Sequence, residues 1–112
     1  MTHYMKLNGL PFEKIKDGSK TIELRLYDEK RQKIKVGDKI CFSCKADTVT
    51  ATVKALHIFR NFEELYAVLP LDKCGYASDE LEAASPDDML LYYSAEQIEK
   101  YGAFGIEIGD IK

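Results

Sequence analysis

The sequence lacks any long run of apolar residues. None of its hydrophobic stretches approaches the ~20 consecutive residues that a membrane-spanning helix needs. The first residues, 1–6, also lack the apolar region of a signal peptide. We therefore expect a protein without a membrane partner and with a cytoplasmic location.

Cysteine is scarce as well, and the three cysteines cannot all pair within the chain, which suits a reducing compartment. Cys41 and Cys44 have the C-x-x-C spacing of many metal and redox sites. However, residues 40–44 have the character of a strand, in which positions i and i+3 point to opposite faces. Packing is the favoured interpretation, so no metal and no cofactor are predicted. A zinc site completed by His57 and Cys74 is the alternative.

The chain also lacks the excess of positive charge that is typical of a general nucleic-acid coat, since its net charge is −3. The charge is nevertheless divided unevenly. Residues 1–60 hold 13 Lys and Arg against 7 Asp and Glu, whereas residues 61–112 hold 3 against 12. Such a division can indicate a surface that faces a polyanion. It equally fits two halves that attract each other in the fold.

What is present indicates a globular protein. With 112 residues, 46% of them hydrophobic and 31% charged, the chain has the size and composition of a single domain over residues 1–112. A short helix is predicted around residues 10–17, with Pro11 near its start and Gly18 at its end. Strands are predicted at residues 4–7, 20–26, 40–44, 48–59 and 104–108.

The remaining elements are indicated by capping and turn residues. Asn61, Ser85 and Ser94 can each begin a helix before the last strand. In the long strand 48–59 the alternation of apolar residues breaks near Leu56, which predicts a bulge there. The basic run 30–35 is interpreted as a solvated loop or helical turn, with phosphate contacts as the alternative. These elements together predict an α+β fold whose five or six strands curl into a small β-barrel.

One stretch combines a strand pattern with charge. Alternation places Thr21, Glu23 and Arg25 on one face of the strand and Ile22 and Leu24 on the other. The apolar face suits a core. The opposite face carries a hydroxyl, a carboxylate and a guanidinium, and its charges can either pair with one another or line a binding site.

In the spacing Gly18-x-Lys20-x-x-Glu23-x-Arg25 the chain resembles the ASCH domain family (activating signal cointegrator homology), a member of the PUA-like superfamily of small β-barrels. The turn at 36–38 and the segment 101–108 extend the resemblance over most of the chain. It implies a PUA-like barrel with a short helix after the first strand, helices before the last strand, and a polar cleft that accepts RNA or a nucleotide-like small molecule.

The resemblance implies that ligand binding involves Gly18, Lys20, Thr21, Glu23, Arg25 and Tyr27. The residue types agree with this role. Arg25 offers a planar donor fork and Lys20 a point charge for phosphate. Glu23 offers an acceptor for an amine or a ribose hydroxyl, and Tyr27 offers a ring on which a base can stack. The predicted function is therefore an RNA- or nucleotide-binding module.

Hydrolysis is the alternative that the resemblance implies. Some small ASCH proteins are amidohydrolases of N4-acetylcytidine that use a lysine, a threonine nucleophile and a glutamate. Lys20 matches that lysine, but Glu23 stands where the threonine would be, and a carboxylate cannot simply replace the hydroxyl. Glu63 and Glu64 are possible positions for the glutamate. A ribonuclease with Lys20 and Glu23 as acid and base is the other catalytic possibility.

Overall fold

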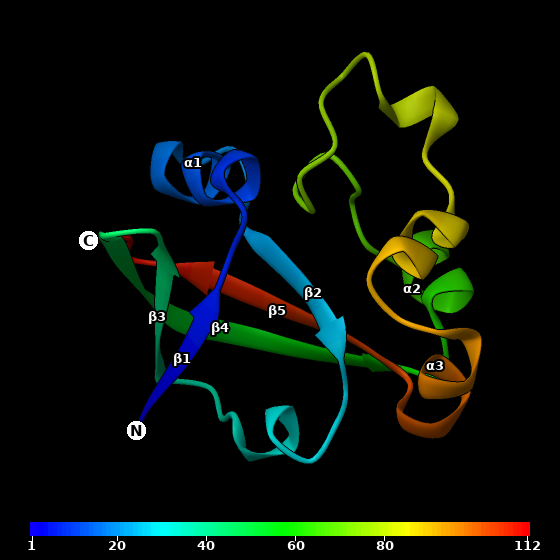
Figure 1. Cartoon of the computed structure of the whole chain (residues 1–112), viewed down its shortest axis with the longest axis horizontal. Coiled ribbons are helices and arrows are strands. Elements are labelled where there is room, and N and C mark those ends of the chain that lie inside the picture. Colours follow the sequence, from blue (N-terminus) through cyan, green and yellow to red (C-terminus); the bar gives the residue numbers. More distant parts are fainter.

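The computed structural model describes residues 1–112 and contains a five-stranded sheet with the order β1-β3-β4-β5-β2 (Figure 1). The strands are β1 (Thr2–Lys6), β2 (Ile22–Leu26), β3 (Lys39–Cys44), β4 (Asp47–Phe59) and β5 (Ala103–Gly109). β1 is parallel to β3, and the other neighbours are antiparallel. The sheet curls into a half-barrel with β1 and β2 as its edges, which confirms the predicted α+β, PUA-like architecture.

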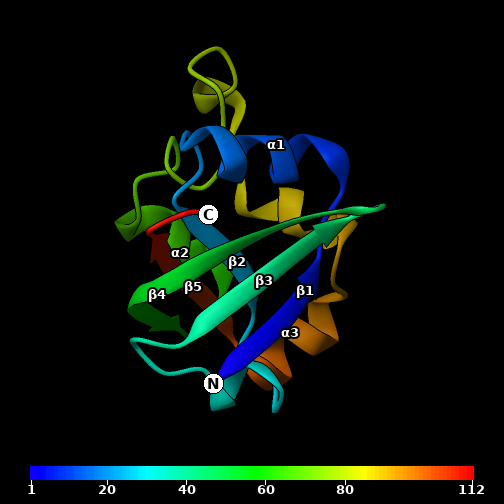
Figure 2. The same cartoon turned by 90° about the vertical axis from the view of Figure 1, so that its left-hand side faces the viewer.

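β4 is the long strand that joins the two halves of the sheet. Its residues 47–52 pair with β3 and its residues 52–59 pair with β5 (Figure 2). The register shifts between Val53 and Ala55, so the bulge lies slightly before the predicted position at Leu56. The sequence pattern does not reveal the exact position, because Ala55 continues the alternation of apolar residues. The pairing of β4 with β5 has nevertheless already shifted between Val53 and Ala55. Such a bulge increases the local bend and twist of a strand.

Helix α1 (Gly9–Asp17) follows β1 as predicted and ends at Gly18. Gly18 has φ 87°, a left-handed conformation that glycine adopts without strain, and its N–H donates to the carbonyl of Ile15. The chain then turns directly into β2. The short helical elements are α2 (Phe62–Val68), α3 (Ala95–Tyr101) and the 3-10 turns η1 (Arg31–Lys33), η2 (Leu81–Ala83) and η3 (Pro86–Leu91).

The predicted caps of the acidic half are present. The side chain of Asn61 accepts the N–H of Glu64 at the start of α2. Ser85 and Ser94 form capping boxes at η3 and α3, although η3 is a 3-10 helix and not an α-helix. None of the helices has the length and apolar character that crossing a bilayer requires.

Two apolar clusters lie on opposite sides of β2. In the first, Phe12 and Ile15 of α1 pack against the inner face of the curled sheet, which includes Phe42 and Phe104. The second lies between β2, α2 and the chain around residues 74–89. Ile22, Leu24 and Leu26 enter this second cluster, as the alternation predicted. The opposite face of β2 is therefore turned toward α1 and β1.

The N-terminus is fixed to the turn before β3 by one carboxylate. Asp38 lies 2.8 Å from His3 Nε2, accepts the N–H of Lys35 at 3.0 Å, and lies 3.5 Å from the terminal amine. These donors, with the His3 bond as the largest contribution, lower the pKa of Asp38 from 3.8 to about 2. The folded state thus favours the ionised carboxylate more than the unfolded chain does.

This carboxylate predicts a pH-dependent contribution to stability. Because the folded pKa is depressed, the contribution is complete above about pH 4 and is lost as the pH falls from about 4 to about 2. Asp38→Asn should lower the Tm at pH 7, and its difference from the wild type should shrink across that acidic range. Thermal denaturation followed by circular dichroism checks this, with the exposed Asp79→Asn as the control. A difference that stays constant down to pH 2 would contradict it.

Candidate functional site

A cleft of about 750 Å³ opens between α1, β2 and the chain at residues 74–93. Its volume lies within the range of small-ligand sites. It is lined by residues from segments that are distant in the sequence, namely Lys6, Leu7, Asn8, Leu10, Pro11, Lys14, Lys20, Glu23, Leu24, Arg25, Ser43, Cys44, Lys45, Tyr66, Cys74, Gly75, Tyr76, Glu80, Asp88, Met89, Leu91, Tyr92 and Tyr93. Figure 1 shows α1 and the chain at residues 74–93, coloured yellow-green to orange, on either side of β2.

An ion triad of two buried residues, Lys20 and Glu23, and the half-buried Arg25 lies at this cleft. Glu23 is 3% exposed and Lys20 is 8% exposed. Lys20 Nζ lies 3.1 Å from Glu23 Oε1, and Arg25 Nε donates to Glu23 Oε2 at 2.9 Å. Each carboxylate oxygen therefore has its own cation. Burying such charges without partners would be very unfavourable, so all three side chains depend on this arrangement.

Arg25 also connects the two edges of the sheet. Its Nη2 donates to the carbonyl of Lys6 at 3.1 Å. Since Lys6 belongs to β1 and Arg25 to β2, this bond spans the gap that no backbone ladder closes. The ion pair with Glu23 fixes the guanidinium while it makes this bond. Its Nη1 amine makes no hydrogen bond within the chain.

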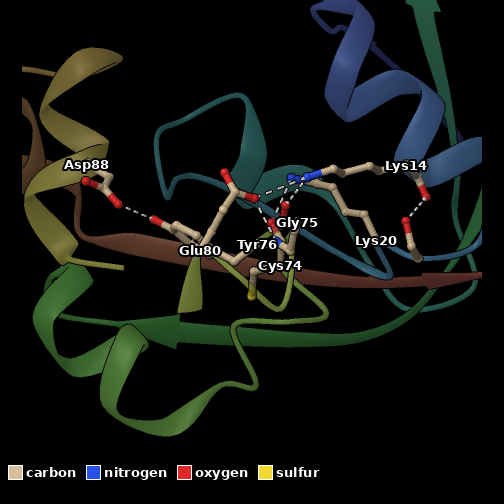
Figure 3. Close-up of polar contacts among 9 residues, drawn as sticks. Lys14, Lys20, Cys74, Gly75, Tyr76, Glu80 and Asp88 are labelled. Carbon is tan, nitrogen blue, oxygen red and sulfur yellow. Dashed lines mark hydrogen bonds and ion pairs between the residues drawn. The ribbon is translucent and has the colours of Figure 1, made fainter. Parts of the chain in front are cut away.

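Lys20 is positioned by a turn that lies more than 50 residues away in the sequence. Its Nζ donates to the carbonyl of Cys74 at 3.1 Å (Figure 3). The neighbouring carbonyl of Lys73 accepts the N–H groups of both Thr21 and Ile22, which fixes the turn to the start of β2. Burial raises the pKa of the Cys74 thiol to about 11, so Cys74 is a protonated packing residue at neutral pH.

Gly75 suits this arrangement both in its backbone conformation and in its lack of a side chain. Its φ of +112° is one that residues with a Cβ rarely adopt. A Cβ at this position would lie 3.3 Å from Lys20 Cδ and 3.4 Å from Lys20 Nζ. The absence of a side chain at Gly75 thus leaves room for the lysine, which a Cβ would displace by a few tenths of an ångström.

A second lysine reaches the same turn from α1. Lys14 Nζ donates to the carbonyl of Gly75 at 2.6 Å and lies 3.7 Å from Glu80 Oε1. Glu80 in turn accepts the N–H of Ala77 at 2.8 Å. Figure 3 shows both lysines pointing toward the turn at Cys74 and Gly75. Lys14 from α1 and Lys20 from the segment before β2 thus both donate to backbone carbonyls of the turn at Cys74 and Gly75.

A hydrogen-bonded chain of two tyrosines and a carboxylate forms the wall opposite the triad. The hydroxyls of Tyr66 and Tyr76 lie 2.7 Å apart, and the Tyr76 hydroxyl donates to Asp88 Oδ2 at 2.7 Å. Burial raises the pKa of both tyrosines, and the bonds to Tyr66 and Asp88 raise that of Tyr76 further. Both hydroxyls stay protonated at neutral pH, and their protons are used within this chain of bonds, since Tyr76 donates to Asp88 and Tyr66 donates to Tyr76.

The charge of the cleft is opposite in sign to that of the whole protein. Its lining includes five basic side chains, Lys6, Lys14, Lys20, Arg25 and Lys45, and three acidic ones, Glu23, Glu80 and Asp88. The balance is +2, whereas the chain as a whole has a net charge of −3. The cleft therefore favours anionic ligands by its local electrostatics.

The structure brings together three of the six predicted ligand-binding residues, Lys20, Glu23 and Arg25. Gly18 and Thr21 lie outside the lining of the cleft, at the turn and at the start of β2. Tyr27 also lies outside it, with its ring 4.9 Å from that of Phe104 in the first apolar cluster.

Several lining residues were not identified from the sequence, in particular Lys14, Tyr76, Glu80 and Asp88. Lys14 is one of many surface-type lysines, Tyr76 and Glu80 lie in a segment without periodicity, and Asp88 was considered only as part of a helix start. Glu63 and Glu64, considered as positions for a catalytic glutamate, do not line the cleft.

The cysteines do not gather into a metal site. No group of three or more His, Cys, Asp and Glu side chains is placed to share an ion. His57 lies 2.8 Å from Glu107 Oε1 on the neighbouring strand, while Cys74 packs in the second apolar cluster. Cys41 and Cys44 are half-buried free thiols of β3. The alternative zinc site therefore has no support in this arrangement.

Comparisons with known proteins agree with the fold and the predicted resemblance. A sequence model of the ASCH domain matches residues 5–112. The crystal structure of the hypothetical protein PH0355 is 34% identical, with a TM-score of 0.77, and the match covers 96% of this chain and 97% of that one. The solution NMR structure of protein PF0455 from Pyrococcus furiosus is 35% identical, with a TM-score of 0.71 and 96% of each chain covered. The curated proteins gave no match.

The ion triad predicts a large difference between two lysine substitutions. Lys20→Met removes one partner of a buried carboxylate and should lower the free energy of unfolding by about 3 kcal/mol. Lys16→Met breaks the exposed pair with Asp47, 3.0 Å long, and should leave the free energy of unfolding almost unchanged. Urea denaturation of both variants measures the contrast. Equal effects would contradict the assignment of Lys20 to a buried, coupled site.

The position of Gly75 beside Lys20 predicts a difference in stability between two glycine substitutions. Gly75→Ala and Gly37→Ala both place a Cβ at positive φ, +112° and +95°, which costs about 1–2 kcal/mol. Only Gly75→Ala crowds Lys20, because nothing lies within 4 Å of the position at Gly37. Gly75→Ala should therefore lower the Tm more than Gly37→Ala. The opposite order would show that the turn at Gly75 adapts without displacing the lysine.

Proposed function

The chain belongs to the ASCH domain family, and from this we propose that its cleft binds a nucleotide unit, either free or within single-stranded RNA. The observation that carries the proposal is the ion triad of Lys20, Glu23 and Arg25 at a cleft whose lining is positive. A buried ion group is weak support for stability, because well-packed apolar residues often do as well. A role in ligand recognition would explain why the fold keeps these three charged side chains at the cleft.

Phosphate is the part of the ligand that this site suits best. Arg25 has an Nη1 amine that makes no bond within the chain, and Lys14 and Lys45 add positive charge nearby. Guanidinium groups bind phosphate through paired, charge-assisted hydrogen bonds. Glu23 orients this donor in advance, so that little side-chain entropy is lost when the ligand binds.

Glu23 acts through its neighbours in this proposal. Its carboxylate is almost fully buried, and each oxygen already accepts from a cation. A carboxylate oxygen has further acceptor capacity, but burial restricts access to it. The proposal therefore assigns phosphate recognition to Arg25 and Lys20 and assigns their orientation to Glu23.

The cleft also offers surfaces for a base. Tyr92 lines it with a ring that is 63% exposed, and Leu10 and Leu91 are exposed apolar residues of the same lining. Aromatic and apolar side chains bind unstacked bases of single-stranded nucleic acid. In this proposal Tyr92 takes the stacking role that the sequence interpretation gave to Tyr27.

Hydrolysis of a modified nucleoside is the second candidate, and the contact between Lys20 and Glu23 favours it. At 3.1 Å these groups can exchange a proton, as an acid and base must. No threonine lies in the lining of the cleft. The lining offers tyrosines, Ser43 and cysteines as nucleophiles, with water as the other source, and binding without reaction is the simpler proposal.

Binding is tested by titrating the protein with single-stranded RNA and with cytidine 5′-monophosphate. Arg25→Gln removes the guanidinium and should weaken both ligands by about tenfold or more, the loss expected for charge-assisted hydrogen bonds. The matched control is Lys54→Gln, which removes a cation paired with Asp110 outside the cleft. It should leave both affinities unchanged at the same salt concentration.

The same proteins are incubated with N4-acetylcytidine to test the second candidate. Release of cytidine that Lys20→Met abolishes would replace the binding proposal with a catalytic one. Wild-type protein that binds neither RNA nor the nucleotide would contradict the proposed function. Binding that Arg25→Gln leaves unaltered in a folded variant would contradict the assignment of the site.

A further inference from the structure

A second, smaller hollow of about 410 Å³ adjoins the cleft at the open edge of the sheet. It lies between β1, the end of β2 and the segment around η1. Lys6, Arg25 and Ser43 line both hollows. The side chain of Arg25, with its bond to the carbonyl of Lys6, therefore stands between two connected spaces.

The charge of this hollow is uniformly positive. Four basic residues, Lys6, Arg25, Lys30 and Arg31, line it, and no carboxylate does. Of the neighbouring acids, Glu23 is bound to Arg25, and Asp28 lies 3.1 Å from Arg31 Nη1. The ammonium group of Lys30 has no partner within the chain, so positive charge remains that these acids do not balance.

Arg31 contributes a further, independent observation. Its side chain is 17% exposed, and its Nε is buried without any hydrogen-bond acceptor. A buried donor left unpaired is unfavourable, so such groups require an explanation. The side chain that carries this donor is part of the lining of the hollow.

The hollow also includes an exposed ring. Tyr4 lies on the edge strand β1 and is 68% exposed. A large aromatic side chain beside several cations is the combination with which proteins bind single-stranded nucleic acid, where bases stack and phosphates pair with Lys and Arg. A free nucleotide bound in the main cleft would not contact this ring, because Tyr4 is not part of the lining of that cleft.

We propose that this second hollow binds the phosphate of the adjoining nucleotide, so that the preferred ligand is a strand and not a free nucleotide. The inference rests on the proposed function, since it extends the ligand of the main cleft across Arg25. Lys30 and Arg31 bind the next phosphate, and Tyr4 provides a surface for its base. The basic run of residues 30–35 thereby has a recognition role in its first two members.

The test compares adenosine 5′-monophosphate with the dinucleotide pApA by calorimetry. The wild type should bind pApA at least about tenfold more tightly, as one further charge-assisted phosphate contact predicts. Lys30→Gln plus Arg31→Gln should abolish this preference and leave the mononucleotide affinity unchanged. The salt dependence of pApA binding should also fall, by a slope of about 0.7 per lost phosphate contact.

Two further variants separate recognition from structure. Lys30→Gln alone leaves the pair of Arg31 with Asp28 intact and should lose part of the preference. Lys54→Gln plus Lys112→Gln removes the same charge from outside both hollows and should retain it. A wild type that binds the mononucleotide but gains nothing from the second nucleotide overturns this inference and leaves the proposed function standing. Failure to bind either ligand overturns the proposed function itself.

Discussion

The buried carboxylate of Glu23 has to be neutralised, and its two cations determine how the surrounding chain is arranged. Lys20 lies 3.1 Å from Glu23 and also donates to the carbonyl of Cys74, so it holds the distant turn against the start of β2, where Gly75 leaves room for the lysine. Arg25 reaches it from the same strand and, once fixed, bonds to the carbonyl of Lys6 on the opposite edge of the sheet. At the open edge the side chain of Arg25, fixed by Glu23, thus connects β2 to β1. Backbone hydrogen bonds connect the other neighbouring strands of the sheet.

The features that the sequence predicted are those with a local cause. Alternation placed Glu23 and Arg25 on one face of β2, and capping residues such as Gly18 and Asn61 marked helix ends within a residue or two. The partners of the triad could not be predicted in this way. Gly75 meets Lys20 across more than 50 residues, in a segment without periodicity, and such a contact depends on tertiary packing alone. Local pattern gave no means to place Tyr27 against Phe104 either.

The uneven division of charge along the sequence now has a structural description. Several contacts join the basic first half to the acidic second half, including Lys14 with Glu80 and Lys54 with Asp110. The attraction of the two halves is therefore present in the fold. The acidic residues lie mainly in elements away from the cleft, so its lining keeps a positive balance within a negative protein. Net charge alone would have hidden this local preference, because electrostatic recognition acts over about 10 Å.

The shared position of Arg25 has a consequence for how the two hollows would act together. An anion in either space draws on the same guanidinium, which is already held by Glu23 and Lys6. If the guanidinium could swing freely, each anion would pull it away from the other space. In the proposed complex the ion pair with Glu23 would hold the guanidinium in place while anions approach from either hollow, so binding in one hollow need not disrupt the other. A lysine, with its single flexible ammonium, would do this less well.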